Sequence, residues 1–432
     1  MTLDFPSRYT SVEYPFGFYV LNYTSRILTA QDERSGNKVD LQVVPVYTDD
    51  IVSMRNILCE LETRGKLKHK NLLSWTHLFA FKNEDNPIPS LCLSFPSSSL
   101  TLLDMIGYFP VCPWPLTHDK VAWMGYQLVS VLHYLHCCKQ VVLHLPLRNI
   151  HVSMDGKYDI QLQDFGWKYP CFRDTVVDDD LRQCRRFSYK WNGFSVLAPE
   201  VLAHASSIST SADMWNFGCV LAMLLTRASL LEEYPKPILC SPGEESMRMA
   251  GEYLGKAPAE FLSTLQEDKK CFFSSSRPSK KPLDSLLLPE VHDIPTGPEN
   301  SSSSTKNASD LIARLLAYPS ERMTSEEAMS HPYFAPFFSE TDVRENIDNA
   351  IDVPAVRTSV DNVDAQECAV RLHRSVAFHE LQHPLELYSL QDICIRTIES
   401  SHCLAGVKKM IYPRPLVERI VEGAESLTSK GS

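Results

Sequence analysis

Three adjacent side chains, His136, Cys137 and Cys138, carry the nitrogen and sulfur atoms that bind zinc in proteins. A structural zinc site needs four such ligands, usually in two closely spaced pairs, and no second pair follows at zinc spacing. We therefore interpret the cluster as core packing. The cysteines of the chain lie among apolar neighbours, which indicates reduced residues of an intracellular protein.

Several short motifs follow one another in a fixed order between residues 60 and 334. They are Glu60, Asn149, Asp164-Phe165-Gly166, Ala198-Pro199-Glu200, the set of Asp213, Trp215 and Gly218, then Arg322 and His331-Pro332-Tyr333-Phe334. In this order they resemble the landmarks of a eukaryotic protein kinase, of the branch that holds MAP kinases and cyclin-dependent kinases. Each motif alone is weak evidence, but the ordered series is strong.

The resemblance implies a role for each landmark. In the family, the residues corresponding to Asp164 and Asn149 hold a metal ion, and the one corresponding to Glu60 pairs with a strand lysine. The residues expected to hold the large lobe together are Glu200, Asp213 and Arg322, with Glu200 and Arg322 as partners. The family chemistry is phosphoryl transfer, which needs positioned phosphates, a metal and a base.

The residues that should grip a nucleotide depart from the family. The phosphate-covering loop needs glycines so that backbone N–H groups can approach the phosphates, but its positions hold Val20, Asn22 and Ser25. The strand lysine is replaced by Gln42, which carries no charge. We expect Glu60 to bond Gln42 or to face solvent.

The catalytic loop departs as well, because His144 stands in place of the base and Pro146 in place of a lysine. A histidine titrates near neutral pH, so its chemistry alone does not exclude a base. Phosphoryl transfer depends mostly on positioning and electrostatics, however, and those groups are missing. We predict a pseudokinase that is not an enzyme and uses no cofactor. The alternative is residual ATP or Mg²⁺ binding at Asp164, Asn149 and Glu60.

An apolar stripe marks the C-terminal part of the chain. It consists of Leu390, Ile393, Cys394, Thr397 and Ile398, at the i, i+3, i+4, i+7, i+8 spacing of an amphipathic helix. Such a helix is either docked on its own domain or kept for a partner. The block resembles the elongin-binding box of the SOCS-box family, whose pattern is filled by Ser389, Leu390, Cys394 and Ile398. In that family the leucine enters an apolar pocket of elongin C.

A proline-containing segment follows the box. Pro413, Pro415 and Leu416 resemble the cullin-5-binding segment of the same family, although Tyr412 and Arg414 depart from its usual sequence. Cullin-2 is therefore the alternative to cullin-5. The resemblance implies elongin B/C and cullin-5, with its RING partner, as binding partners.

Periodicity predicts the elements that carry these residues. Apolar and alternating runs around Ser35-Gly36-Asn37 predict a hairpin, and residues 51–66 have the periodicity of a helix. Residues 98–140 and 200–226 also predict helices, of which 214–226 is apolar enough to be buried. The predicted fold class is α+β, with a β-rich small lobe, a helical large lobe and a small all-α C-terminal module.

Composition shifts predict the domain limits. These are a leader at 1–14, a kinase-like domain at 15–338 with an insert at about 230–307, a linker at 339–377 and a SOCS box at 378–432. Residues 271–309, rich in serine and proline, predict a mobile surface insert. Residues 339–375 are acidic and polar, and predict a connector with a single short helix.

Composition also excludes several classes of function. A chain of 432 residues with 44% hydrophobic and 22% charged residues suits a soluble protein of two or three domains. The net charge of −11 and the lack of a basic patch argue against nucleic-acid binding. No apolar run is long enough to span a membrane, and the N-terminus does not resemble a signal peptide. We expect a cytoplasmic protein, with the nucleus as the alternative.

The favoured hypothesis is a substrate receptor of an elongin B/C–cullin-5 ubiquitin ligase. The kinase-like body would hold a target, and residues 389–421 would dock the ligase machinery. One alternative is a pseudokinase that scaffolds or regulates an active kinase, with its C-terminal helices packed on its own body. The other is an atypical active serine/threonine kinase. The sequence reveals neither the target nor the face of the body that binds it.

Overall fold

The structure of the chain is a computed structural model. It describes residues 8–13, 20–22, 25–46, 51–83, 86–97, 100–107, 116–143, 145, 147–153, 156–163, 197–203, 205–206, 208–226, 242–274 and 301–382. These residues form two compact units. The small unit contains the described residues of 1–66, 74–97 and 355–382, and the large unit those of 67–73 and 98–354.

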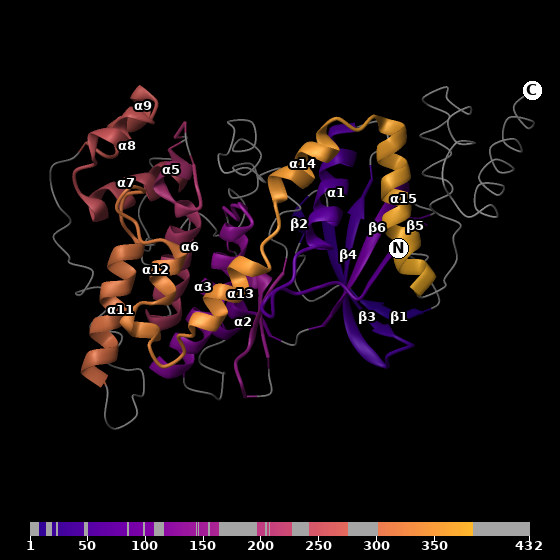
Figure 1. Cartoon of the computed structure of the whole chain (residues 1–432), viewed down its shortest axis with the longest axis horizontal. Coiled ribbons are helices and arrows are strands. Elements are labelled where there is room, and N and C mark those ends of the chain that lie inside the picture. Colours follow the sequence, from indigo (N-terminus) through magenta and orange to yellow (C-terminus); the bar gives the residue numbers. More distant parts are fainter. Residues whose placement is uncertain are drawn as a thin grey trace, which may run out of the picture. The chain divides into compact units, whose positions relative to one another are not determined.

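A six-stranded antiparallel sheet forms the small unit, with strand order β1-β3-β4-β6-β5 and β2 paired to β3 (Figure 1). The strands are β1 Tyr9–Glu13, β2 Val20–Asn22, β3 Ser25–Asp32, β4 Asn37–Pro45, β5 His77–Asn83 and β6 Asn86–Pro96. The β3–β4 pairing confirms the predicted hairpin. Gly36 in its turn has a φ of 68°, a conformation that glycine adopts at little cost. Leu28, Leu41, Phe79 and Cys92 pack together as the core on this sheet.

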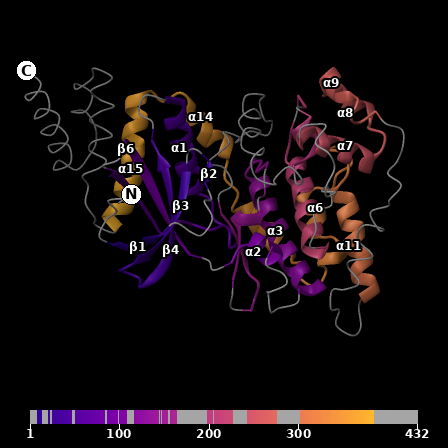
Figure 2. The same cartoon turned by 180° about the vertical axis from the view of Figure 1, so that it is seen from behind.

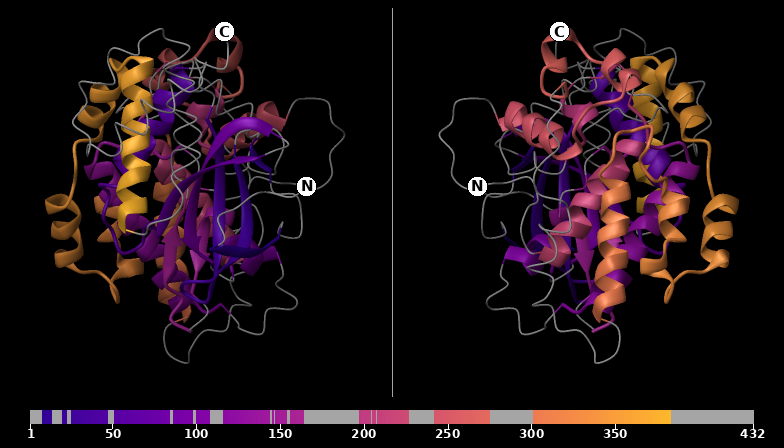
Figure 3. Two further views of the ribbon diagram at one scale, coloured as in Figure 1. Left: turned by 90° about the vertical axis from the view of Figure 1, so that its right-hand side faces the viewer. Right: turned by 90° about the vertical axis from the view of Figure 1, so that its left-hand side faces the viewer.

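Two helices pack together in the small unit. Helix α1 spans Ile51–Arg64, as the periodicity predicts, and α15 spans Ala365–Gln382. Helix α14, Val353–Asp361, precedes α15 in the chain. Helix α15 packs against both α1 and strand β5, and Figure 3 shows it beside the sheet. Residues at the two ends of the described sequence therefore share one core.

The large unit is mainly helical. Its helices are α2 Leu102–Gly107, α3 His118–Cys137, α5 Pro199–Leu202, α6 Ser211–Thr226, α7 Pro242–Leu254, α8 Ala259–Ser263, α9 Glu267–Lys270, α11 Ser301–Leu315, α12 Ser325–Met329 and α13 Glu340–Asp348. Its other elements are the 3₁₀ turns η1 Leu147–Asn149 and η3 Pro332–Phe334, and the hairpin of β7 Ile150–Val152 with β8 Ile160–Leu162.

Helix α6 is the buried centre of the large unit, as its apolar sequence predicts. Helices α3 and α11 pack on it, and Figure 2 shows the three together. A glycine lets α11 approach closely, because a Cβ atom on Gly218 would lie 2.9 Å from Cβ of Leu315. The predicted partners Glu200 and Arg322 lie beside α6, and the Arg322 guanidinium donates to the Glu200 carboxylate at 2.5 and 3.2 Å. Both side chains are almost fully buried.

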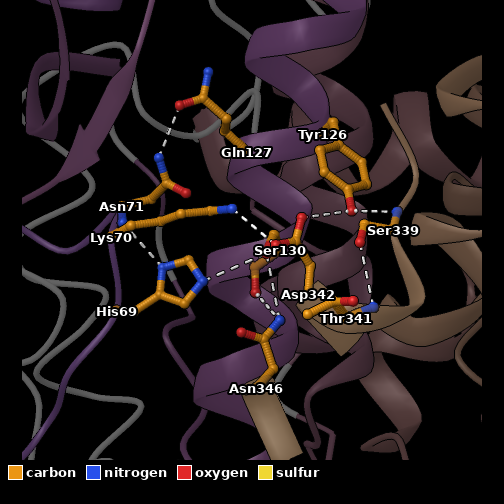
Figure 4. Close-up of polar contacts among 10 residues, drawn as sticks. All are labelled: His69, Lys70, Asn71, Tyr126, Gln127, Ser130, Ser339, Thr341, Asp342 and Asn346. Carbon is orange, nitrogen blue, oxygen red and sulfur yellow. Dashed lines mark hydrogen bonds and ion pairs between the residues drawn. The ribbon is translucent and has the colours of Figure 1, made fainter. Parts of the chain in front are cut away.

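Helix α13 is fastened to α3 by polar contacts, shown in Figure 4. The Asp342 carboxylate accepts from the Tyr126 hydroxyl at 2.9 Å and pairs with Lys70 Nζ at 2.9 Å. The buried Asn346 amide donates to the backbone carbonyl of Ser130 at 3.1 Å. These bonds hold the segment that follows η3 onto the large unit.

Two segments differ from the sequence-based expectation. Where a connector with one short helix is expected at 339–375, the structure has α13, α14 and most of α15. Where a mobile insert is expected at 271–309, the serine run from residue 301 begins α11. The physical reason is the same in both, because widely spaced apolar residues provide a buried helix face within a polar sequence. In α11 these residues are Ala308, Leu311, Ile312 and Leu315.

The predicted α+β fold, a β-rich lobe followed by a helical lobe, is confirmed. The predicted all-α module at 378–432 lies outside the described residues beyond Gln382. Among the described residues, none of the helices combines the length and apolar character that crossing a bilayer requires.

The Glu200–Arg322 pair generates a stability prediction. We expect Glu200→Gln to lower the free energy of unfolding by ~3–5 kcal/mol, because it leaves the Arg322 charge buried without its partner. Urea denaturation of the full chain measures the change. The control is Glu340→Gln, which removes an ion pair with Arg344 whose side chains are 77% exposed, and should cost less than about 1 kcal/mol. Equal losses in the two variants would contradict the assignment.

Candidate active site

Strand β4 places Gln42 within the sheet, between Ile27 of β3 and Leu93 of β6. The residue is 0% exposed. Neither the nitrogen nor the oxygen of its side-chain amide makes a hydrogen bond to a described residue. Buried polar groups are nearly always hydrogen-bonded. The Gln42 amide is an exception among the described residues, because both its donor and its acceptor lack a partner there.

Helix α1 supplies the second predicted residue, Glu60, which is 1% exposed. Arg64, one turn later, brings its Nε atom to 3.8 Å from a carboxylate oxygen of Glu60. The Arg64 guanidinium also lies 5.8 Å from the ring centroids of both Trp75 and Phe95. Arg64 thus provides Glu60 with a counterion from within its own helix. The expectation that Glu60 bonds Gln42 or faces solvent is wrong in both parts.

Asp213 of α6 organises the loop that leads to the expected catalytic positions. Its buried carboxylate accepts from the backbone N–H groups of Val142 at 2.9 Å and Leu143 at 2.6 Å. Asn216 donates its side-chain amide to the Leu143 carbonyl at 2.7 Å. Leu143 has a φ of 61°, which is unfavourable for a residue with a side chain and is held here by these bonds. The loop is therefore fixed up to the residue before His144.

The histidine–cysteine cluster belongs to a chain of hydrogen bonds that ends on Asp213. His136 Nε2 lies 2.9 Å from the Asp213 carboxylate, and His136 Nδ1 lies 3.1 Å from Ser325 Oγ. His133 Nδ1 lies 3.2 Å from the same Ser325 hydroxyl, and His133 Nε2 lies 3.7 Å from Cys137 Sγ. Because the hydroxyl has one proton, it donates to one histidine and accepts from the other. Within the described ranges, no group of three or more His, Cys, Asp or Glu could hold a metal ion.

Asn149, the predicted metal ligand of the catalytic loop, ends η1 and is 5% exposed. Its carbonyl accepts from the N–H of Gln163 at 2.8 Å, so the hairpin of β7 and β8 fixes this end of the loop. The predicted site residues that lie outside the described residues are His144, Pro146, Asp164, Ser389, Leu390, Cys394, Ile398, Pro413, Pro415 and Leu416. Of the predicted residues that are described, the structure joins Glu200 to Arg322, and it shows no hydrogen bond between Gln42 and Glu60.

Sequence reasoning missed two residues of these networks, Arg64 and Ser325. The i, i+4 spacing of Glu60 and Arg64 is a signal for an ion pair along a helix. Such pairs are usually on the surface, so the spacing does not by itself indicate a buried counterion. No sequence signal links Ser325 to His136, because the two residues are far apart in the chain.

The comparisons with known proteins extend over most of these elements. Residues 23–334 match the family model of the protein kinase domain. Mitogen-activated protein kinase 4 of Arabidopsis thaliana is 24% identical over 314 residues, covering 72% of this chain and 73% of that protein. Mitogen-activated protein kinase hog-1 of Neurospora crassa is 23% identical over 345 residues, covering 79% and 82%. The family match ends before residue 389, so the SOCS-box resemblance stays a prediction.

The family match contradicts the prediction that the chain is not an enzyme. That prediction weighed single positions, whereas the match extends over residues 23–334 and the relatives are mitogen-activated protein kinases. Phosphoryl transfer arises from many groups that position and stabilise the phosphates together. His144, Pro146 and Asp164 lie outside the described residues, so no geometry supported the prediction. The prediction of no cofactor is likewise unsupported, because the family uses ATP and Mg²⁺.

The described residues do not supply the phosphate contact that ATP requires at the lysine position. Gln42 has an amide donor that is not used within the described small unit, but its side chain is 0% exposed and carries no charge. The cation nearest to Glu60 in sequence, Arg64, is paired with it. At this position the small unit therefore holds a buried neutral amide in place of a lysine.

Asp40, two residues before Gln42, generates a prediction on pH. Its carboxylate accepts from Ser97 Oγ at 3.0 Å and lies 3.4 Å from Thr29 Oγ1. Burial raises the pKa of Asp40 from 3.8 to about 6. Between these values the folded state holds the proton more tightly than the unfolded chain does. The stability of the fold therefore falls as the pH rises through this window.

We expect Asp40→Asn to remove this penalty. The variant should be more stable than the wild type by ~1–3 kcal/mol at pH 7 and by little at pH 4, since each pKa unit corresponds to about 1.4 kcal/mol. Urea denaturation at the two pH values measures the difference. Asp159→Asn, at an exposed position, serves as the control. A gain of the same size at both pH values would show that Asp40 is not the titrating group.

Proposed function

Because this chain belongs to the protein kinase family and is related to mitogen-activated protein kinases, we propose that its kinase domain binds a protein target for ubiquitylation. In this proposal, residues 389–421 recruit elongin B/C and cullin-5 with its RING partner. The chain is then the substrate-recognition subunit of a ubiquitin ligase.

One observation carries the proposal, the spacing of the C-terminal box. Leu390, Cys394 and Ile398 recur every four residues, directly after the small residue Ser389. Residues four apart lie on one face of a helix, so these side chains would form a continuous apolar ridge. The ridge suits a hydrophobic groove on a partner.

The contacts of the large unit support a binding role for the kinase domain. A receptor must hold its target near the ubiquitin-loaded enzyme, and a rigid body keeps the bound target within a narrow range of positions. The buried Glu200–Arg322 pair and the bonds to Asp213 provide this firmness at the centre of the unit. Recruitment then raises the effective concentration of the target, which promotes ubiquitin transfer by proximity.

A binding experiment tests the proposal. We expect purified full-length chain to bind recombinant elongin B/C, and Leu390→Ala/Cys394→Ala to weaken binding at least thirtyfold, since the loss of even one anchor of about 2 kcal/mol weakens binding about thirtyfold. The matched control is Arg396→Ala, which lies in the same segment but off the apolar stripe and should bind like the wild type. Titration by calorimetry measures the dissociation constants.

Two results would overturn the receptor role. One is a wild-type chain that does not bind elongin B/C. The other is a loss of binding as large in Arg396→Ala as in the double variant, which would indicate that the segment had merely unfolded. If elongin binds but Pro413→Ala/Pro415→Ala leaves cullin-5 binding unchanged, the cullin part of the proposal fails.

The family match favours a second candidate function, phosphoryl transfer from ATP to a protein hydroxyl group. The relatives are named mitogen-activated protein kinases, and residues 23–334 match the family model of the protein kinase domain. In this chain Asp164 would hold Mg²⁺ on the phosphates, by resemblance to the family.

Transfer of labelled γ-phosphate to a generic protein substrate tests the second candidate. We expect Asp164→Ala to lower the rate by about 10²–10³, the loss typical of removing one group that stabilises developing charge. Asp159→Ala, at an exposed position a few residues earlier, should leave the rate unchanged. The absence of transfer by the wild type, or a rate that Asp164→Ala leaves intact, would exclude this candidate.

A further inference from the structure

The half-buried carboxylate of Asp40 is held through one of its two oxygen atoms. Oδ1 accepts from Ser97 Oγ at 3.0 Å and from Thr29 Oγ1 at 3.4 Å. Within the described ranges, none of the hydrogen bonds of this side chain ends on Oδ2. An ionised carboxylate has about four acceptor sites, so the sites on Oδ2 stay available to a ligand or to water.

Asp40 also differs from other acids of the small unit in having no counterion among the described residues. Asp32 is paired with Arg8, and Glu60 with Arg64. The influences on the pKa of Asp40 are burial, which raises it, and the two hydroxyl groups, which lower it, with no charged side chain among them. Removing a charge from water without a counterion is costly. Asp40 therefore brings an unbalanced negative charge to β4 at neutral pH.

This charge lies on the same face of β4 as Gln42, because side chains alternate between the two faces of a strand. The pairing of β4 with β3 and β6 runs without a register shift, so the alternation is kept. Figure 1 shows β4 within the sheet. Phe95 of β6 pairs with Asp40 and lies under the guanidinium of Arg64, so this face is the one toward α1. The Cα atoms of residues 40 and 42 are about 7 Å apart along the strand.

The shared face matters because Gln42 stands where the family has its phosphate-holding lysine. Relative to that pattern, the site loses one positive charge at residue 42. It gains one negative charge at residue 40. Both changes act against a ligand that carries negative charge here. Two like charges about 10 Å apart in a partly buried site repel each other enough to weaken binding about tenfold.

Asp40 is the group on this face whose charge changes near neutral pH. Its pKa is raised to about 6 by burial. His77 of β5 lies on the opposite face, because it pairs with Ser94, which pairs with Leu41. The charged side chains of the described residues on β4 and α1 toward this face are Lys38, Glu60 and Arg64.

We propose that Asp40 is a specificity-determining residue, and that through it the β4 face of this chain disfavours nucleoside triphosphates relative to uncharged nucleosides. This role of Asp40 rests on the second candidate function, since it requires that a nucleotide binds beside β4. It adds which ligand the site prefers and which residue sets the preference. The selection is electrostatic, so its strength follows the charge of the ligand.

Calorimetric titration of the full chain with adenosine, AMP and ATP–Mg²⁺ tests the selection. At pH 7.5 we expect Asp40→Asn to bind ATP about tenfold tighter than the wild type, with a smaller gain for AMP and about none for adenosine. The matched control is Glu33→Gln, which removes an equal charge from the exposed turn of the same hairpin. It should bind ATP like the wild type, because the charge of an exposed residue is screened by salt.

A second titration at about pH 5 asks whether the charge of Asp40 is responsible. The wild type should then bind ATP as tightly as Asp40→Asn does at the same pH, since Asp40 is mostly protonated below its pKa. Comparison at one pH also cancels the protonation of ATP itself.

Two results would overturn the role of Asp40 while leaving nucleotide binding intact. One is an ATP affinity of Asp40→Asn equal to that of the wild type at pH 7.5. The other is a gain as large for adenosine as for ATP, which would indicate a change of shape or stability and not of charge. If neither protein binds any of the three ligands at either pH, the second candidate function fails, and the role of Asp40 fails with it.

Discussion

A charge removed from water must be balanced inside the protein, and this constraint governs the contacts at the centre of both units. Glu60 is met by Arg64 in the small unit, and Glu200 is met by Arg322 in the large one. Among the described residues, Asp213 is met by two backbone N–H groups and a histidine in place of an arginine. In each case the group that balances the charge also holds a helix or loop in position.

The way in which Glu60 is balanced sets this chain apart from the expectation drawn from its family. A counterion on the neighbouring strand would tie the Glu60 carboxylate to the sheet, whereas Arg64 lies on the same helix as Glu60 and meets the sheet through the ring of Phe95. Gln42 on the strand is left with an unused amide within the described residues. Helix α1 is also bound by Arg371 of α15, through Glu62, and by the Val363 carbonyl before α15, through Arg55.

Sequence reasoning predicted the elements whose patterns are local and strong. The alternating runs around Gly36 indicated the hairpin, and the apolar run at 214–226 indicated the buried helix. It missed α14 and α15, because a buried stripe such as Cys368, Leu372 and Val376 is diluted by charged neighbours. The order of motifs indicated the Glu200–Arg322 pair. The prediction of inactivity failed because single positions do not report how many groups share the work of catalysis.

The most direct test of this account is the coupling energy between Glu60 and Arg64, measured by urea denaturation of a double-mutant cycle. Glu60→Gln and Arg64→Met should each lower the free energy of unfolding by ~3–5 kcal/mol, because each leaves one buried charge unbalanced. The double variant should lose at least ~1 kcal/mol less than the sum of the two. Losses that add within about 0.5 kcal/mol would contradict the pairing, and with it the claim that α1 balances its own buried charge.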